Sequence, residues 1–342
     1  MRAAILEEYG RVETKEVAIP QPPAGEILLK VLGCGVCGTD VHLASGEVPL
    51  ARPPVVLGHE IAAEVYAVAG GEGFERGEHV VVDPVIGCGH CRWCRQGLTN
   101  LCVSPTIVGY VRSGGFCQYM SVPARQIYRV PARFSPKDGI LVETLACVLH
   151  GYDRLAPRPG SSVLIMGAGT VGLLWLQLIK HSLTTFVMQT DLVESRVATA
   201  KKLGADITGD ISSTEPADLL GHHGISDFDI IIDATGNPVA LTSALPFLGK
   251  GGTCMFFGVC PEDAHIQISP YEMFLKEQTL IASKMPPKAF DQAIALLAAG
   301  VINTEALVNR VLALDQAGDA LRMFVEEKDK GIKMMINPWS GG

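Results

Sequence analysis

The sequence predicts an α/β protein with a β-rich first domain and a second domain built on a doubly wound parallel sheet. The region up to about residue 147 contains strand-like runs separated by Gly and Pro clusters, including EILLKVLG, IAAEVYAVAG and EHVVVDPVIG. After the segment PRPG at 157–160, strands alternate with helical patterns, which indicates a parallel sheet with helices on both faces. The chain has 342 residues, enough for two domains of ordinary size.

The second domain can be followed element by element. SSVLIMGAG is a buried strand that runs into glycines, and TVGLLWLQLIKHS places apolar residues at helical spacing. TTFVMQTD predicts a second strand, and SRVATAKKLGAD predicts a helix that ends at Gly204. DFDIIIDATG and GGTCMFFGV repeat the pattern of a strand followed by glycine. From about Pro286, AFDQAIALLAAG and DQAGDALRMFVEEKDKG predict helices, and IKMMINP predicts a final strand.

Composition and charge exclude several classes of protein. Hydrophobic residues make up 48% of the chain and charged residues 19%, which is typical of a globular protein. The net charge of −8 argues against a nucleic-acid-binding protein, because such proteins present basic surfaces to the phosphates. No window approaches eighteen uncharged apolar residues, and MRAAILEEYG has no long apolar run. We therefore expect a cytoplasmic protein with no signal peptide, no membrane span and no nucleic-acid partner.

Four of the ten cysteines lie within the segment CGHCRWCRQGLTNLC, in the pattern C-x2-C-x2-C-x7-C. This spacing is typical of a tetrahedral Zn²⁺ site, and four thiolates leave no open position, so the site would be structural. A reduced cluster without metal is the alternative. The predicted ligands are Cys88, Cys91, Cys94 and Cys102. The cysteines expected to be buried small hydrophobes are Cys34, Cys117, Cys147, Cys254 and Cys260.

A glycine-rich loop follows the strand SVLIM and opens a helix, which is the context that indicates dinucleotide binding. Its residues are Gly167, Ala168, Gly169, Thr170, Val171 and Gly172. The glycines allow a tight turn and close approach of a pyrophosphate to the helix N-terminus. Asp191 ends the second strand and would accept hydrogen bonds from ribose hydroxyls, which favours NAD over NADP. Arg196 could soften that preference, and Asp191 could instead be a strand-end cap.

A second predicted metal site is reactive. Cys37 lies in CGTDVH, and His59 and Glu60 follow in the tripeptide GHE. One thiolate, one imidazole and one carboxylate would make an open Zn²⁺ site with a position for water or substrate. Each residue alone is ambiguous, since a lone Cys or His is more often packed in a core. Together with the dinucleotide loop they predict a catalytic zinc.

Together, GCGVCGTDVH, GHE, the four-cysteine segment and GAGTVG resemble the zinc-dependent medium-chain dehydrogenases, the superfamily of alcohol, sorbitol and threonine dehydrogenases. The resemblance covers essentially the whole chain, including GGFCQYMSVP, KKLGAD and DATG. It implies a GroES-like catalytic domain at 1–150, a Rossmann NAD-binding domain at 151–285, and a segment 286–342 that returns to the catalytic domain. It also implies one catalytic and one structural zinc per subunit, and a homo-oligomer, either a tetramer or a dimer.

Site residues follow from the resemblance by position. Cys37 and His59 match zinc ligands, and Glu60 matches a ligand of the sorbitol dehydrogenase branch. Glu143, in VETLACVLHG, matches a glutamate that binds zinc directly or through water, and it favours the polyol branch because ordinary alcohol dehydrogenases have Cys there. Thr144 departs from the usual Pro. Glu143 could alternatively be a salt-bridged carboxylate at a helix start.

The implied reaction is oxidation of a secondary alcohol in a polyol to a ketose, with hydride transfer to NAD. The resemblance gives Thr39 the first step of a proton relay, and His42 is the natural outlet because histidine titrates near neutrality. Phe116 matches a pocket wall or is a core residue. The alternatives are L-threonine 3-dehydrogenase, a secondary-alcohol or butanediol dehydrogenase, and a non-enzymatic binding protein that keeps the nucleotide loop.

Overall fold

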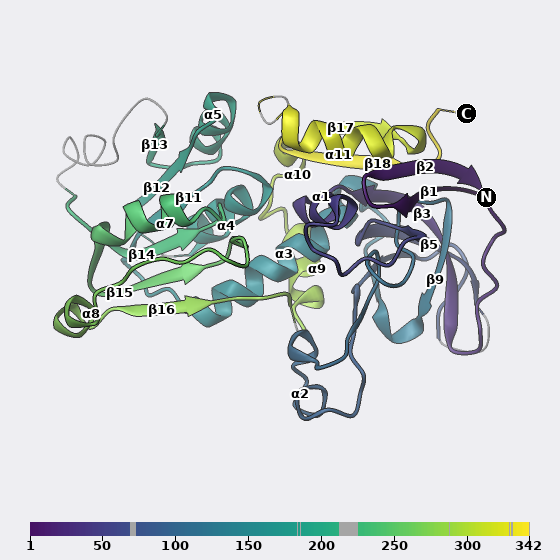
Figure 1. Ribbon diagram of the computed structural model, residues 1–342, viewed down its shortest axis with the longest axis horizontal. Helices are drawn as coiled ribbons and strands as arrows, with labels where there is room; N and C mark the ends of the chain where they lie inside the picture. Colours follow the sequence, from purple (N-terminus) through teal and green to yellow (C-terminus); the bar gives the residue numbers. More distant parts are fainter. Residues whose placement is uncertain are drawn as a thin grey trace. The chain divides into compact units, whose positions relative to one another are not determined.

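The computed structural model describes residues 1–68, 73–182, 184, 186–211, 225–286, 288–327, 329 and 331–341. The chain forms two compact units, one made of Met1–Ala146 with Pro286–Gly342 and the other of Cys147–Met285 (Figure 1). In the first unit, Arg2 Nη1 donates to the Gly341 carbonyl at 3.3 Å, so the two ends of the described chain lie together. None of the described helices combines the length and apolar character needed to cross a bilayer.

The first unit is built mainly on antiparallel strands, with one parallel pair, β17 and β18, among the described strands. Within the described residues a seven-stranded sheet has the order β10-β6-β5-β3-β18-β17, with β9 also pairing with β3. A three-stranded sheet has the order β2-β1-β4, and β7 pairs with β8. The strands are β1 (Arg2–Glu8), β2 (Arg11–Glu16), β3 (Glu26–Gly35), β4 (Val55–Val56), β5 (Glu60–Val68), β6 (His79–Val82), β7 (Val85–Ile86), β8 (Thr106–Ile107), β9 (Tyr119–Pro123), β10 (Ile127–Arg129), β17 (Val308–Ala313) and β18 (Lys333–Asn337).

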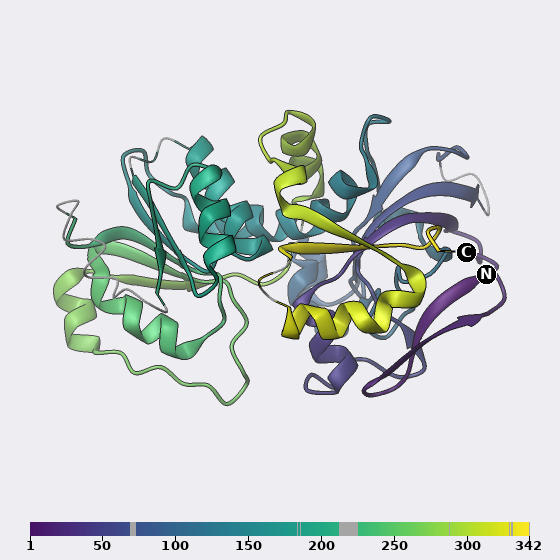
Figure 2. The same cartoon turned by 90° about the horizontal axis from the view of Figure 1, so that it is seen from above.

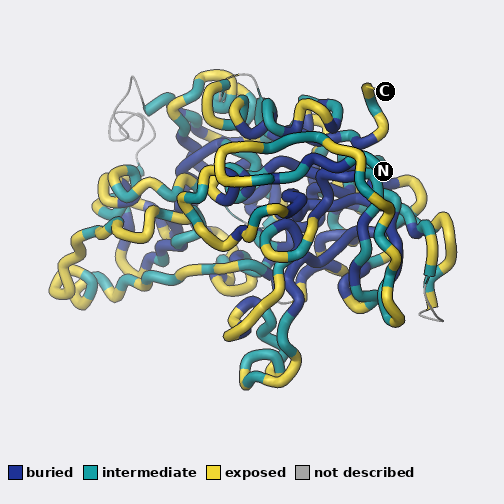
Figure 3. Tube along the Cα trace, turned by 45° about the vertical axis from the view of Figure 1, so that its right-hand side comes forward, coloured by how far each residue is buried: buried dark blue, intermediate teal, exposed yellow. Residues whose placement is uncertain are grey.

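Strand β18 comes from the end of the sequence but lies inside the sheet of the first unit. It pairs antiparallel with β3, with Met335 opposite Gly35 and Ile336 opposite Cys34. This register brings the start of β18 to the turn that follows β3, where the reactive cysteine lies. The inner strands carry the core of the unit, and the tube in Figure 3 is dark blue along them.

Short helices complete the first unit. They are α1 (Gly38–Ser45), α2 (Arg92–Arg95), α9 (Phe290–Ala298), α10 (Thr304–Leu307) and α11 (Ala317–Glu326), with 3₁₀ turns η1 (Thr99–Leu101), η2 (Ala124–Gln126) and η4 (Leu314–Gln316). Helix α11 lies against α1 and β2. The amphipathic periods near the end of the sequence thus correspond to α9 and α11.

The second unit is a doubly wound parallel sheet, as predicted. Its described strands have the order β13-β12-β11-β14-β15-β16, and every pairing is parallel. Figure 2 shows the teal helices on one face of this sheet and the green α7 on the other. The elements are β11 (Ser162–Met166), α4 (Thr170–His181), β12 (Phe186–Asp191), α5 (Glu194–Lys202), β13 (Ile207–Asp210), β14 (Phe228–Asp233), α7 (Pro238–Ala244), η3 (Leu245–Phe247), β15 (Leu248–Phe256), α8 (Pro270–Lys276) and β16 (Thr279–Ala282).

One helix was not expected. The pattern up to residue 147 showed no long helical period, but α3 runs over Pro136–Leu155. Ser135 begins it, because Asp138 Oδ2 accepts from the Ser135 amide at 2.9 Å and from its hydroxyl at 2.8 Å. The helix has no polar stripe in its middle turns, where Ile140, Leu141, Val142, Leu145 and Ala146 are all fully buried. A helix buried on all sides shows no amphipathic period, so periodicity could not reveal it.

Two further expectations need correction. The run EHVVVDPVIG is not one strand, because β6 ends before Asp83 and Pro84 and β7 starts at Val85. Among the cysteines expected to be buried, Cys34, Cys117 and Cys254 are buried, whereas Cys147 and Cys260 are only half-buried.

Candidate active site and metal centres

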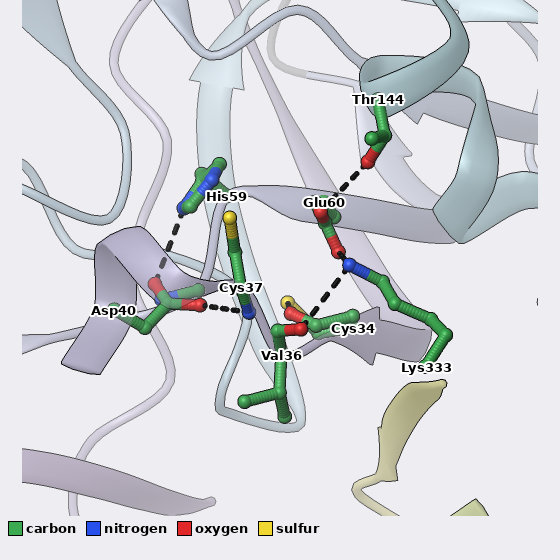
Figure 4. A network of polar contacts seen from close by, with 10 residues as sticks. Cys34, Val36, Cys37, Asp40, His59, Glu60, Thr144 and Lys333 are labelled. Carbon is green, nitrogen blue, oxygen red and sulfur yellow. Dashed lines mark hydrogen bonds and ion pairs between the residues drawn. The ribbon is translucent and has the colours of Figure 1, made fainter. Parts of the chain in front are cut away.

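The reactive cluster is formed where β3 leads into α1 and where β5 begins. Cys37 caps the N-terminus of α1, His59 precedes β5 and Glu60 is its first residue. Single ligand atoms of these three residues lie within 4.8 Å of one another (Figure 4). His59 is 5% exposed and Glu60 is 1% exposed. A thiolate, an imidazole and a carboxylate at this spacing fit one Zn²⁺ ion with a position left open.

Asp40 orients two members of this cluster. Its Oδ2 accepts from the Cys37 amide at 2.9 Å, and its Oδ1 lies 3.2 Å from His59 Nδ1. With Nδ1 donating to the carboxylate, Nε2 is the nitrogen left for a metal. Burial lowers the pKa of His59, but the Asp40 carboxylate outweighs burial and the net pKa lies well above its usual value. Asp40 is fully buried, so it is a fixed part of the site.

Glu60 has two protein partners of its own. Its carboxylate forms an ion pair with the ammonium group of Lys333, the first residue of β18. Thr144 Oγ1 donates to Glu60 Oε1 at 2.7 Å, and Lys333 Nζ donates to the Val36 carbonyl at 3.1 Å (Figure 4). Burial lowers the pKa of Lys333, but the charges of Glu60 and Cys37 outweigh it and the net pKa is raised. Thr144, which stands where the family usually has Pro, thus provides a hydrogen bond that Pro could not make.

The residues predicted to form the proton relay lie on helix α1. Thr39 and His42 are three positions apart, so they lie on one side of the helix. His42 is half exposed, and its Nδ1 lies 2.8 Å from Glu47 Oε2. An exposed imidazole at this position can exchange protons with solvent.

Glu143 lies in the middle of α3 rather than at a helix start, and it is 9% exposed. Among the described residues, the group of ligand atoms within 4.8 Å contains Cys37, His59 and Glu60 but not Glu143. The Glu143 charge acts on Tyr110 and on Asp83. Burial raises the pKa of Asp83 to about 7, the Val85 amide opposes this shift, and Glu143 adds to it.

Sequence reasoning missed Asp40, Lys333 and Tyr110. Asp40 lies within CGTDVH, three residues after Cys37, so its position could have suggested a partner for a metal ligand. Lys333 has no local signal. Tyr110 packs its ring edge-on against His59, with centroids 5.7 Å apart and planes at 76°. Of the two interpretations given for Phe116, pocket wall or core residue, the structure supports the second, since Phe116 is fully buried in the core of the first unit.

The four-cysteine segment forms a second cluster, on a loop that extends away from the strands of its unit near α2 (Figure 1). One sulfur from each of Cys88, Cys91, Cys94 and Cys102 lies within 4.8 Å of the others. Backbone amides point at these sulfurs, for example from Cys88 to Cys102 Sγ at 3.2 Å and from Cys91 to Cys88 Sγ at 3.4 Å. The Cys94 amide is the main cause that lowers the pKa of Cys91 to about 6. These features fit a closed tetrathiolate zinc site.

The glycine loop joins β11 to α4. Gly167 has φ of 94°, which favours glycine, and Gly169 is the N-cap of the helix that begins with Thr170 and Val171. A Cβ on Gly172 would collide with the Gly167 carbonyl, and Gln189 Nε2 donates to that carbonyl at 2.8 Å. A Cβ on Gly169 would have only Arg196 Nη1 near it, at 3.8 Å. The helix start is therefore open to a pyrophosphate, with a guanidinium beside it.

Asp191 lies next to this loop at the end of β12. Its Oδ2 accepts from the Ala168 amide at 2.6 Å and its Oδ1 accepts from the Val193 amide at 2.9 Å. The carboxylate therefore ties the loop to the second strand. It also stands where a ribose would lie if the loop holds a dinucleotide.

A Rossmann sheet with this loop, combined with an open thiolate, imidazole and carboxylate cluster, defines the class of metal-assisted, nicotinamide-dependent dehydrogenases. Family models agree. Residues 23–132 match the alcohol dehydrogenase GroES-like domain, and residues 170–299 match the zinc-binding dehydrogenase family.

Individual relatives cover most of the chain. A D-altritol 5-dehydrogenase of Agrobacterium fabrum is 34% identical over 87% of this chain and 88% of its own. A sorbitol dehydrogenase of Bacillus subtilis is 28% identical over 99% and 97%. An L-threonine 3-dehydrogenase of Vibrio parahaemolyticus is 33% identical over 73% and 74%.

Solved structures give the same fold. A zinc-binding dehydrogenase of Sinorhizobium meliloti bound to NADP superposes with a TM-score of 0.91, at 31% identity over 98% of this chain and 99% of its own. The rspB alcohol dehydrogenase of Escherichia coli with NADH gives 0.90, at 28% identity over 98% and 99%. This chain belongs to the zinc-binding alcohol dehydrogenase family, within the medium-chain dehydrogenases.

Proposed function

We propose that this chain oxidises a secondary alcohol of a polyol to a ketose and transfers the hydride to NAD. The observation that carries the proposal is the make-up of the reactive cluster, in which carboxylates replace the second thiolate of an ordinary alcohol dehydrogenase. Glu60 lies within ligand distance of Cys37 and His59, and Glu143 is buried close enough to act on Tyr110. Relatives named D-altritol 5-dehydrogenase and sorbitol dehydrogenase support the substrate class.

The charges of the site favour a neutral substrate. Asp40, Glu60 and Glu143 are buried acidic residues, and the buried cation Lys333 is already paired with Glu60. A polyol has hydroxyl groups that can donate to carboxylates and carries no charge to be compensated. A substrate carboxylate would instead meet the negative charges of these acidic residues.

Each residue has a definite task in the proposed reaction. Zinc, when bound, would supply Lewis-acid activation of the alcohol, and NAD would supply the hydride acceptor. Cys37 and His59 would hold the metal, with Asp40 keeping His59 in the tautomer that leaves Nε2 free. The Thr39 hydroxyl would accept the alcohol proton while it passes its own proton onward, and His42 would release a proton to solvent, with Glu47 holding His42 Nδ1. Glu60 and Glu143 complete the metal's surroundings or accept hydrogen bonds from a neighbouring hydroxyl.

The proposed cofactor set is NAD with two zinc ions. The closed cluster at Cys88–Cys102 would hold a structural ion and the open cluster a catalytic one. Asp191 supports NAD, because a carboxylate repels the 2′-phosphate of NADP. Arg196, beside Gly169, is the residue through which NADP could still bind, and a structural relative is bound to NADP.

We also propose a homo-oligomer, either a dimer or a tetramer. Strand β16 is the outermost strand of the described Rossmann sheet, and the preceding helix α8 exposes large apolar side chains. Tyr271 is 70%, Phe274 77% and Leu275 57% exposed. An open sheet edge next to exposed aromatic residues is a surface that association would cover. Light scattering at micromolar concentration would give the oligomeric state.

The second candidate is L-threonine 3-dehydrogenase, which is favoured by the relative of that name at 33% identity. Threonine has an ammonium and a carboxylate group that the site would have to bind. The acidic residues suit the ammonium group, but Lys333 is engaged by Glu60 and is not available to the carboxylate. We therefore place this activity second.

The test is NADH absorbance with purified, zinc-loaded protein and either NAD or NADP. The substrates are four- to six-carbon polyols, L-threonine, butanediols and simple secondary alcohols. Strong NAD reduction with one polyol configuration is the expected result, and it would also identify the stereocentre. Turnover of threonine alone would replace the proposal by the second candidate. No turnover in protein shown to bind zinc and NAD would contradict both.

A further inference from the structure

Tyr110 lies next to the reactive cluster on a loop that backbone hydrogen bonds hold in place. Residues 108–116 fold back onto the segment that leads to His59, and three backbone bonds fix them there. The Gly114 amide donates to Val56 O at 2.8 Å, Gly115 to Gly58 O at 2.8 Å and Phe116 to Leu57 O at 3.0 Å. A Cβ on Gly109 would lie 2.8 Å from Gly58 O, so the two backbones touch closely. The position of Tyr110 relative to His59 is therefore set by the backbone.

The Tyr110 ring lies against His59, one of the predicted metal ligands. The ring contacts His59 edge-on at 5.7 Å between centroids. The charges that act on the phenol are those of His59, Cys37, Asp40 and Glu143. A tyrosine hydroxyl carries a proton that it can donate in a hydrogen bond.

This phenol has no hydrogen-bond partner among the residues that the structure describes. The side chain is half-buried, and tyrosine hydroxyls in such surroundings normally find a partner. In the described part of the chain no group accepts a hydrogen bond from the Tyr110 hydroxyl, whereas Glu60 and His59 both have protein partners. The phenol is thus a donor available to a bound molecule.

We propose that Tyr110 determines substrate specificity by donating a hydrogen bond to the hydroxyl next to the reacting carbon, so that the preferred substrates are vicinal diols. This inference rests on the proposed function. Cys37 and His59 fix where the reacting oxygen must lie, and Tyr110 contacts His59 directly. An oxygen on the adjacent carbon is the substrate group that can reach the phenol while the reacting oxygen stays at the metal position. Its acceptor is a neutral hydroxyl, which the surrounding carboxylates tolerate.

The experiment compares substrates that differ by one hydroxyl group. Zinc-loaded wild-type protein and the Tyr110→Phe variant are assayed with NAD and with the stereoisomers of 2,3-butanediol or with 2-butanol. Tyr128→Phe is the matched control, since Tyr128 stacks on Phe290 elsewhere in the first unit, with centroids 5.0 Å apart. Calorimetric titration of each protein–NADH complex with 2,3-butanediol gives a second readout that needs no turnover.

Loss of one neutral hydrogen bond should lower kcat/KM of Tyr110→Phe for the preferred butanediol about tenfold and weaken its binding by a similar factor, while 2-butanol changes by less than about twofold. Equal changes for diol and mono-alcohol, or unchanged diol binding, would overturn the inference. Zinc content below that of wild type would also overturn it, because Tyr110 would then support the metal site instead. If wild type oxidises no alcohol, the proposed function fails, and the titrations still decide the role of Tyr110.

Discussion

The ammonium group of Lys333 and the carboxylate of Glu60 form an ion pair in which the side chains are 3% and 1% exposed. The pair joins the first residue of β18 to the first residue of β5 inside the first unit. Glu60 therefore has a charged protein partner next to the predicted metal position. A zinc ion that binds Cys37 and His59 therefore meets a glutamate whose charge is already balanced.

Replacing Lys333 by Met should destabilise the fold strongly. The change leaves Glu60 buried without its cation, and breaking one partner of a buried pair typically costs about 3–5 kcal/mol. Urea unfolding of the zinc-loaded protein measures the loss. Lys137→Met is the control, because Lys137 pairs with the exposed Glu305 and such pairs contribute under about 1 kcal/mol. A further change of Glu60→Gln in the Lys333→Met background should recover much of the stability; no recovery would mean that the pair is not the cause.

Replacing Cys94 by Ser should remove one of the two zinc ions that we propose. The closed cluster then lacks a thiolate, and the free energy of metal binding that stabilises its loop is lost, on the order of several kcal/mol. Metal analysis and thermal unfolding measure the two effects, with Cys260→Ser as the control outside both clusters. The turnover number of the protein that remains folded should stay near that of wild type. A complete loss of turnover at full folding would contradict a structural role.

Replacing Thr39 by Val should lower kcat by about 100-fold or more, because the first proton acceptor of the relay is lost. Zinc content and NAD binding should not change, since Val has nearly the size of Thr and a threonine hydroxyl is not one of the usual zinc ligands. Thr39→Ser keeps the hydroxyl and should keep most of the activity. Equal turnover in the Val variant and wild type would exclude the relay.

Replacing Asp83 by Asn should stabilise the protein at alkaline pH. The folded-state pKa of Asp83 is raised to about 7, whereas an unperturbed carboxyl titrates near about 3.9. Between these values the folded state keeps a proton that the unfolded state has released, so this group lowers stability as pH rises through the window and no further above it. The Asn side chain can still accept from the Val85 amide, which lies 2.9 Å from Asp83 Oδ1.

The expected gain is on the order of 2–4 kcal/mol near pH 8 and close to zero near pH 4, measured as urea unfolding at both pH values. Asp263→Asn, at an exposed position, serves as the control. A gain of the same size at both pH values would show that the titration of Asp83 is not responsible.

Local patterns predicted the Rossmann half of this protein well. Four strands of the parallel sheet, β11, β12, β14 and β15, contain a short apolar run that the sequence analysis named, whereas β13 and β16 were not predicted. The glycine loop is defined within six consecutive residues. The four cysteines also lie close in sequence, so their spacing alone brings them together. In such cases the sequence separation is small and the backbone geometry limits the outcome.

Contacts between segments that are distant in the sequence could not be predicted from local patterns. Lys333 reaches Glu60 only because β18 pairs with β3, and no property of IKMMINP specifies that neighbour. Tyr110 faces His59 because a loop of glycines packs on Gly58, which depends on the three-dimensional path of both segments. Helix α3 was not predicted because its middle turns are buried on all sides and so lack the alternation of apolar and polar residues that identifies an amphipathic helix.

The pairing of β18 with β3 also orders the events of biosynthesis. The four-cysteine loop has all its sulfurs once Cys102 has left the ribosome, and it can take up a metal while the chain is still growing. Cys37, His59 and Glu60 are made early too, but Glu60 must wait for Lys333 before its charge is matched. A nascent chain that ends before Lys333 therefore has every sulfur of the four-cysteine cluster but lacks the cation that pairs with Glu60.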